Sequence, residues 1–233
     1  MELNYNWNEV IEVFDRLNLE HYLHNPDYDS YFNANMIDFI DNKCPEGWDI
    51  DAGCTKFVLL TPDHYNCIIK IPFNSDGDCE DIYPFENAYY PIADEYGWDY
   101  CQSETEYYEL ATEAGVEDLF AKTEYIGDYC GFPVYAQEKC ESISSIRTKE
   151  NITVPHSPHF EEAKKAVSDE LTHVWFCSVN YLGIMLDTYG FEKVKKFDSF
   201  ISNYRIHDLH DQNYGYKKST FIPKLFDFSG YGE

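Results

Sequence analysis

Apolar residues near the start of the chain recur three or four positions apart, at Val10, Val13, Phe14 and Leu17. This is the spacing of one helical face, so we expect an amphipathic helix over residues 8–23. A second short helix is expected near residues 36–40, where four of five positions are apolar. The stretch 44–53 that follows is rich in turn residues.

The pattern then changes to short apolar runs, which indicate strands. Residues 54–73 hold two such runs on either side of the turn sequence TPDHYN, which predicts an antiparallel hairpin. Residues 74–98 are acidic and irregular, and we interpret them as an insertion. Helical spacing resumes over residues 99–120, with Gly115 as the expected stop. Residues 121–141 predict two more strands around a DYCG turn.

The second half of the chain has a helical pattern. Residues 142–159 are expected to form a loop or linker. One long helix, or two, is predicted over residues 160–190, and another over residues 191–205. The stretch 219–228 returns to the pattern of a strand. A β-rich half with one inserted helix therefore precedes a helical half, which predicts an α+β fold.

Charge is spread unevenly along this pattern. The chain has 233 residues and a formal charge of −26. Residues 1–140 hold 30 acidic and 6 basic side chains, whereas residues 141–233 hold 13 and 11. Such an acidic first part would repel the phosphates of a nucleic acid, so we expect no direct nucleic-acid binding. The charge indicates either a solvated surface or a polyanion mimic with a basic protein partner.

Cysteine usage and hydropathy point to a reducing compartment. None of the eight cysteines forms a CxxC pair, so the spacing does not predict a zinc site, and we expect reduced, mostly buried thiols. The sequence has no run of eighteen apolar residues and no signal-peptide pattern at its start. We therefore expect a cytoplasmic protein without membrane association.

Polar residues suited to phosphoryl transfer stand at fixed points in the pattern. Lys70 lies near the end of the strand CIIKIPF, and Glu104 falls on the inner face of the helix that follows. Later, HDLHDQN contains Asp208 and Asn213, and KLFDFSG contains Asp227. Each residue alone is compatible with a surface lysine, a solvent-facing acid or a turn aspartate. Their joint order predicts one shared site.

This order resembles the protein-kinase-like fold, which has five strands with a helix after the third, then helices and a catalytic loop. CIIK is similar to the Val-Ala-Ile-Lys strand of kinases. IHDLHDQN is similar to the His-Gly-Asp-Leu-His-x-x-Asn loop of aminoglycoside and choline kinases. DFSG is similar to Asp-Phe-Gly, with serine in place of the glycine.

The resemblance implies a two-lobed fold with a minimal C-lobe. Residues 1–43 would form an N-terminal helical extension, and residues 44–140 a β-rich N-lobe with the insertion at 74–98. Residues 141–233 would form a truncated helical C-lobe.

The resemblance also implies a Mg²⁺-ATP-dependent phosphotransferase with ATP and Mg²⁺ as cofactors. Lys70 would contact the nucleotide phosphates, and Glu104 would hold it, with Glu106 as the alternative if the helix is rotated. Asp208 would accept the proton of the attacking acceptor hydroxyl and orient that hydroxyl. The hard oxygen ligands of Mg²⁺ would come from Asn213 and Asp227.

The chain departs from the kinase pattern in two places. Its nucleotide loop, DIDAGCTKF, has one glycine, so Gly53, Cys54 and Thr55 are the candidate phosphate-binding backbone positions. Three residues follow Gly230, so we expect the acceptor site in earlier segments or on a partner. The acceptor, a small molecule or a protein, is not identified by the sequence.

Two further expectations concern function. A minimal chain of this kind would suit a phage or a mobile genetic element. The alternative to catalysis is a pseudokinase, or an acidic interaction or inhibitor protein, that uses the fold as a binding scaffold.

Overall fold

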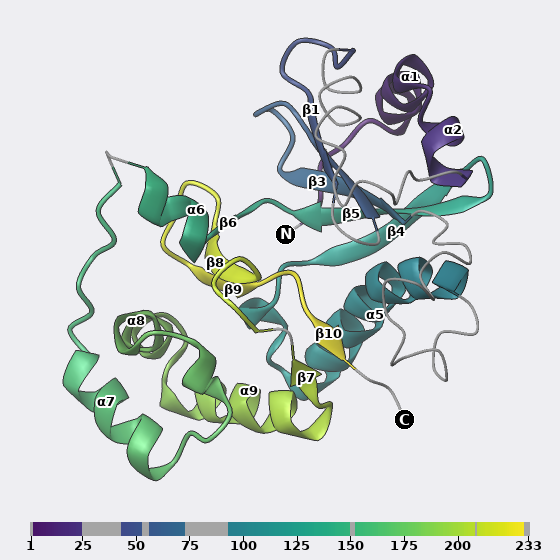
Figure 1. The fold of residues 1–233 in the computed structure, drawn as a ribbon. Helices are drawn as coiled ribbons and strands as arrows, with labels where there is room; N and C mark the ends of the chain where they lie inside the picture. The colour runs from purple at the N-terminus through teal and green to yellow at the C-terminus, as the bar shows by residue number, and fades with distance from the viewer. Residues whose placement is uncertain are drawn as a thin grey trace. The chain divides into compact units, whose positions relative to one another are not determined.

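The structure of the chain is a computed structural model (Figure 1). It describes residues 2–24, 43–52, 56–72, 93–149, 152–207 and 209–230. The chain forms two compact units. The first unit holds Met1–Gln102 and Thr123–Glu138, and the second holds Ser103–Lys122 and Lys139–Glu233.

The first unit begins with two short helices in place of the single helix expected over residues 8–23. Helix α1 (Trp7–Leu17) is capped by Asn6, whose side chain accepts from the N–H of Asn8. Asn18 then adopts the left-handed conformation, with φ of 55°, and ends α1 before α2 (Leu19–His24). The second helix expected near residues 36–40 lies outside the described residues.

A five-stranded antiparallel sheet forms the centre of the first unit (Figure 1). Its strand order is β1-β2-β3-β5-β4. The strands are β1 (Asp49–Ala52), β2 (Lys56–Leu60), β3 (Cys67–Pro72), β4 (Thr123–Tyr129) and β5 (Phe132–Glu138). The hairpin predicted over residues 54–73 is confirmed as β2 and β3, and the strand pair around DYCG is confirmed as β4 and β5.

Alternating side chains of the sheet pack with the two N-terminal helices in one apolar core. Phe14 and Leu17 of α1 are fully buried there, together with Ile69 of β3 and Val134 of β5. The amphipathic face predicted for the first helix is therefore confirmed by its burial.

Helix α5 (Ala93–Ala114) follows β3 and ends at Gly115, which has φ of 71°. The predicted stop at Gly115 is confirmed. Residues 93–98, the end of the segment 74–98 that was expected to be irregular, belong to this helix. The rest of that insertion lies outside the described residues.

The second unit is mainly helical after residue 139, with α6 (Ile143–Thr148), α7 (Phe160–Asp169), η2 (Val174–Phe176), α8 (Val179–Tyr189) and α9 (Phe191–Asn203). The linker expected over residues 142–159 is partly wrong, because Ser142 caps α6 by accepting from the N–H of Ser145. Residues 160–190 were predicted to form either one long helix or two helices. The structure has two α-helices there, α7 and α8, so the second alternative is confirmed. Helix α9 confirms the prediction over residues 191–205.

Short strands complete the second unit (Figure 1). Strands β6 (Cys140–Ser142), β8 (Tyr214–Lys217) and β9 (Pro223–Leu225) form one antiparallel sheet in the order β6-β8-β9. Strands β7 (Ile206–His207) and β10 (Ser229–Gly230) form a separate pair. The strand predicted over residues 219–228 is confirmed in part as β9.

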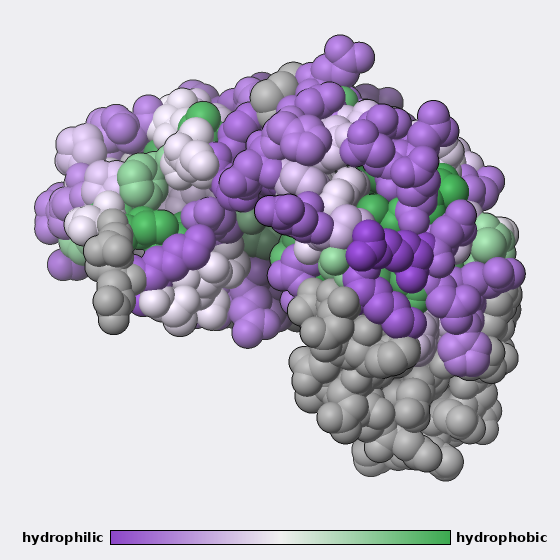
Figure 2. Space-filling model, turned by 90° about the horizontal axis from the view of Figure 1, so that it is seen from above, coloured by the Kyte–Doolittle hydropathy of each residue, from purple (hydrophilic) through white to green (hydrophobic). Residues whose placement is uncertain are grey.

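These elements confirm the predicted α+β class. Along the described parts of the chain, no helix is both long and apolar enough to cross a membrane. Figure 2 shows one face of the molecule, where most described residues are hydrophilic and the hydrophobic ones form small, scattered groups. This is the surface expected from the acidic composition.

Candidate functional site

Lys70 is deeply buried in the first unit, on the central strand β3. Its side chain is 2% exposed, and its cross-strand partners are Val58 on β2 and Tyr135 on β5. Lysine is almost never buried this far unless its charge is paired. The interpretation of Lys70 as an ordinary surface lysine is therefore wrong.

Glu104 is the inward-facing acid of helix α5, in the second unit. It is 1% exposed, whereas Glu106 is exposed, so the helix has the rotation first expected and the alternative is wrong. Tyr107, one turn further along, is also buried, at 8% exposed. Glu104 is therefore a buried carboxylate on an otherwise apolar helical face.

The two predicted Mg²⁺ ligands lie beside each other at the open end of a hairpin. Strand β8 starts directly after Asn213, and β9 ends two residues before Asp227. Tyr214 pairs with Leu225, so the chain enters and leaves the hairpin at the same point. The carbonyl oxygen of Asn213 accepts from the N–H of Phe226 at 3.1 Å and from the N–H of Asp227 at 3.2 Å. The backbone thus joins the two motifs.

A second pairing joins the same two motifs from their outer sides. His207, directly before Asp208, pairs with Ser229, two residues after Asp227. Phe228, which precedes β10, is 4% exposed and contacts the ring of Tyr107 with centroids 5.9 Å apart. Helix α5, the loop before β8 and the DFSG segment therefore meet within the second unit.

His210 braces the loop between these strands. The N–H of Asn213 donates to the His210 carbonyl oxygen at 2.9 Å, which closes a turn. On the side chain, the ring Nε2 lies 3.2 Å from Asn213 Nδ2, and the ring Nδ1 lies 3.3 Å from the backbone nitrogen of Gln212. A neutral imidazole has one acceptor nitrogen, so it takes one of these donors at a time. In both cases the ring restricts the loop.

Helix α6 holds this loop from a third direction. The Ser144 N–H donates to the carbonyl oxygen of Asp211 at 2.9 Å, and Arg147 Nη1 lies 2.8 Å from Asp211 Oδ2. The ion pair is largely exposed, so it contributes at most about 1 kcal/mol, but the backbone contact fixes the path of the loop.

Four predicted site residues cannot be placed in this geometry. Asp208 and the nucleotide-loop positions Gly53, Cys54 and Thr55 lie outside the described residues.

The donors at the hairpin end suit a hard cation that is completed by phosphate oxygens. Asn213, 6% exposed, and Asp227, half-buried, offer amide and carboxylate oxygens. Mg²⁺ is commonly held by one or two protein ligands together with substrate phosphates and water. Within the described ranges, no group of three or more His, Cys, Asp and Glu side chains could hold a metal ion. The donor oxygens of Asn213 and Asp227 are of the kind that binds Mg²⁺.

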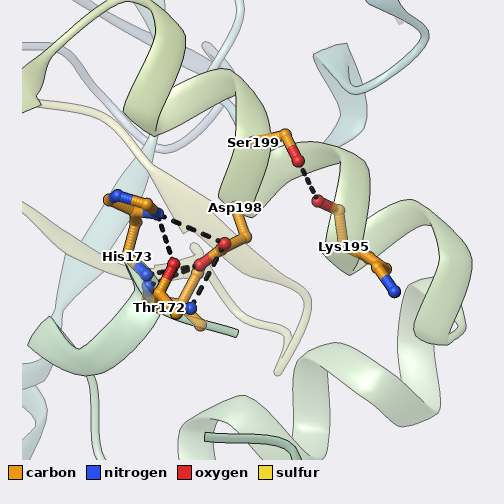
Figure 3. Close-up of polar contacts among 6 residues, drawn as sticks. Thr172, His173, Lys195, Asp198 and Ser199 are labelled. Carbon is orange, nitrogen blue, oxygen red and sulfur yellow. Dashed lines mark hydrogen bonds and ion pairs between the residues drawn. The ribbon is translucent and has the colours of Figure 1, made fainter. Parts of the chain in front are cut away.

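A buried acid in the second unit escaped the sequence analysis. Asp198, 5% exposed on α9, accepts from the N–H groups of Thr172, His173 and Val174 at 3.3, 2.6 and 2.9 Å (Figure 3). In addition, His173 Nδ1 lies 3.4 Å from Oδ2 of the same carboxylate. Asp198 therefore anchors the turn before η2. Its signal in the sequence is an acid at an apolar position of the helix, next to Phe197.

Cysteine chemistry does not explain the site. The six cysteines among the described residues are free thiols, of which two are buried, three are half-buried and Cys130 is exposed. The expectation of mostly buried thiols is therefore wrong for this part of the chain. Burial raises the pKa of Cys177 to about 12, and desolvation followed by the charge of Glu20 raises the pKa of Cys130. A raised pKa disfavours the thiolate, which is the nucleophilic form of cysteine, at both of these residues.

Comparisons of the chain with protein-family models, with curated proteins and with solved structures found no match. The residues and their arrangement are therefore what indicates a function for this chain.

Proposed function

We propose that this chain is a Mg²⁺-ATP-dependent phosphotransferase with a minimal protein-kinase-like fold. The observation that carries the proposal is the contact of one carbonyl oxygen, that of Asn213, with the N–H groups of Phe226 and Asp227. It brings together two short motifs that the kinase resemblance assigns to metal binding. The contact joins backbone groups, and it places Asn213 and Asp227 at the same end of one hairpin.

The element order supports the proposal independently of the motifs. The first unit has a five-stranded antiparallel sheet, and the helix that carries Glu104 follows its third strand. The kinase resemblance predicts this order. The burial of Lys70 and Glu104 adds to it, since the resemblance assigns both residues to nucleotide binding and neither is a solvated surface charge.

In the proposed reaction, the acceptor hydroxyl attacks the γ-phosphorus of ATP, the bond from that phosphorus to the β–γ bridging oxygen breaks, and ADP leaves. The hydroxyl proton passes to Asp208. When bound, Mg²⁺ neutralises charge on the phosphates. Asn213 and Asp227 would hold the ion through oxygen atoms, and Lys70 would supply a point charge to the phosphates. Asp208 would accept a hydrogen bond from the acceptor hydroxyl and orient it. The acceptor is left open as a small molecule or a protein.

Replacement of Asp227 tests this function most simply. We expect purified wild-type protein to consume ATP in the presence of Mg²⁺, by transfer to an acceptor, to itself or to water. Asp227→Ala should abolish this activity, while Asp169→Ala, an exposed acid at the end of α7, should keep it. ATP consumption that survives Asp227→Ala, or that is missing from the wild type, would refute the proposal.

A second candidate function follows from the charge. The chain carries −26, and the acids are concentrated in residues 1–140. Used as a scaffold, the fold would then bind a basic protein as a mimic of a polyanion. This function predicts salt-sensitive binding to a basic probe such as polylysine, and no rise of the melting temperature with Mg²⁺-ATP. The phosphotransferase predicts that rise, because a ligand of the folded state stabilises it.

A further inference from the structure

Two buried lysines share one face of the sheet in the first unit. Val58 on β2 is the direct partner of Lys70 on β3, so their side chains lie on the same face. Lys56 stands two residues before Val58 on the same strand, and side chains two apart in a strand also share a face. Lys56 and Lys70 are therefore diagonal neighbours on adjacent strands, about 7–8 Å apart at the backbone.

This face is the one turned away from the apolar core of the first unit. The residues between and beside the lysines, Phe57, Ile69 and Ile71, belong to that core and point to the opposite side. Even so, Lys56 is 6% exposed and Lys70 is 2% exposed. The two ammonium groups are thus directed to one side of the sheet and largely shielded from solvent.

The clustering is unusual for so acidic a unit. By sequence, the first unit holds 24 acidic and 4 basic side chains, the latter being Arg16, Lys43, Lys56 and Lys70. Half of its cations are therefore buried as neighbours on one face of the sheet. Asp51 on the edge strand β1, opposite Val58, adds an exposed carboxylate to the same face.

We propose that Lys56 and Lys70 together bind the phosphate chain of the ligand, with Lys56 as a second phosphate-binding lysine on strand β2. The inference rests on the proposed function in taking a nucleoside triphosphate as the ligand. A chain of adjacent phosphates carries several negative charges a few ångströms apart, and it can contact two neighbouring ammonium groups at once. Each lysine reaches it as a point charge on a flexible stem.

The pair also accounts for a gap in the motif. The loop before Lys56 has one glycine where protein kinases have three, so it has fewer positions suited to a close backbone approach to phosphate. A side-chain ammonium at the start of β2 supplies positive charge that the missing glycine positions do not. The ligand class is therefore a di- or triphosphate in preference to a monophosphate, because a single phosphate is too short to contact both lysines well.

The test uses the whole chain and four ligands, each with Mg²⁺: inorganic tripolyphosphate, ATP, ADP and AMP. Affinities are measured by calorimetry for wild type, Lys56→Met, Lys70→Met and Lys43→Met. Methionine keeps most of the length of the side chain and removes its charge. Lys43 is the matched control, since it is a lysine of the same unit that precedes the sheet. Circular dichroism and thermal melting establish that each variant is folded.

We expect affinity in wild type to rise from AMP to ADP to ATP. Lys56→Met and Lys70→Met should each weaken tripolyphosphate and ATP binding by about tenfold or more and AMP binding by less. Lys43→Met should leave all four affinities within about twofold, as expected for a charge that makes no contact with the ligand.

The outcomes separate this inference from the proposed function. If ATP binds and is consumed but Lys56→Met binds it as wild type does, the inference is wrong and the phosphotransferase stands. If tripolyphosphate binds through both lysines but ATP is not consumed, the inference stands and the phosphotransferase is wrong. Failure of the wild type to bind either ligand would overturn both. If Lys56→Met does not fold, Lys56→Arg decides: it keeps the charge and should retain binding.

Discussion

At the residue scale, the best-defined polar groups of this protein hold backbone rather than other side chains. One carboxylate, that of Asp198, accepts from three consecutive N–H groups, and one carbonyl oxygen, that of Asn213, accepts from two. Such groups fix turns that apolar packing alone leaves loosely specified, because a buried N–H without an acceptor is costly. The two residues therefore give separate tests of the second unit.

Asp198→Asn should destabilise the protein by about 2 kcal/mol or more. The amide keeps one acceptor oxygen, loses the charge, and turns an NH₂ group toward backbone N–H donors (Figure 3). Urea unfolding measures the change. Ser199→Ala is the control on the same helix, because its exposed hydroxyl only donates back to the Lys195 carbonyl oxygen, and it should stay within about 0.5 kcal/mol. Equal stability of the two variants would contradict the role given to Asp198.

His210→Ala should weaken the Mg²⁺ dependence of nucleotide binding without unfolding the protein. The ring lies against the Asn213 amide and restricts its orientation, and loss of such a supporting contact typically costs about tenfold or more in metal affinity. Nucleotide binding titrated against Mg²⁺ gives the readout, with Gln212→Ala, exposed in the same loop, as control. An unchanged Mg²⁺ requirement would mean that His210 is only part of the turn.

At the scale of elements, close backbone approach and single caps decide the structure of the second unit. Gly215 on β8 pairs with Ser142 on β6, where the strands come so close that a side chain at this position has no room. The start of α6 depends in the same way on one side chain, the Ser142 hydroxyl. Neither the close approach at Gly215 nor the Ser142 cap produces a repeating pattern of apolar residues. The spacing of apolar positions in the sequence therefore does not reveal either feature.

Gly215→Ala should destabilise the second unit by about 1–3 kcal/mol or more. The added Cβ would collide with the carbonyl oxygen of Glu141 and lie 2.8 Å from the Ser142 Cα, so β6 and β8 would have to separate. Thermal unfolding and amide hydrogen exchange of β6 and β8 measure the effect. Unchanged protection of both strands would contradict the close approach.

The ion pair between Lys193 of α9 and Asp118 of η1 (Glu117–Leu119) should stabilise the protein at neutral pH and lose this effect in acid. A hydrogen bond from Lys193 Nζ, 2.6 Å from Asp118 Oδ2, is the main cause that lowers the Asp118 pKa below its usual 3.8. A lowered pKa in the folded state stabilises the protein above the unfolded value, and this contribution is lost as the pH falls through the folded value.

Lys193→Met should therefore cost less than about 1 kcal/mol at pH 7, since the Asp118 carboxylate is largely exposed. The difference from wild type should shrink below about pH 4, and urea unfolding at about pH 7 and about pH 3 measures it. Lys196→Met, an exposed lysine of the same helix, is the control. A difference that grows in acid would contradict the assignment.

The sequence predicted the elements with regular periods and missed those with local causes. The hairpin of β2 and β3, the β4–β5 pair and the stop at Gly115 follow from period, turn residues and a left-handed glycine. The break at Asn18 was missed because the apolar face continues through it to Leu23. Helix α6 was missed because six residues show no period.

The candidate site was predictable only in part, for a related reason. Asn213 and Asp227 stand in recognisable short motifs, and a spacing of fourteen positions suits a hairpin that returns to its start. Asp198 has no motif, because its partners are backbone N–H groups about 25 positions earlier. The pairing of Lys56 with Lys70 depends on the register of two strands, which the sequence alone does not fix.

At the scale of the whole molecule, the distribution of charge bears on both candidate functions. Acidic side chains dominate residues 1–140, yet two of the few lysines there are buried on one sheet face. A polyanion mimic would act through its exposed acidic side chains and gives the shared position of these two lysines no part in function. The proposed phosphotransferase assigns both lysines to the phosphates of the nucleotide, so their position favours it over the scaffold.

The central claim is that Asn213 and Asp227 hold a divalent ion of a bound nucleotide. A crystal structure of the chain with Mn²⁺ and a non-hydrolysable ATP analogue tests it most directly, because anomalous scattering locates the ion without assumptions. The account predicts a Mn²⁺ peak within coordination distance, about 2.0–2.3 Å, of an Asn213 Oδ1 and an Asp227 carboxylate oxygen, with phosphate oxygens completing the shell. A Mn²⁺ peak elsewhere, or a nucleotide bound away from these residues, would contradict it.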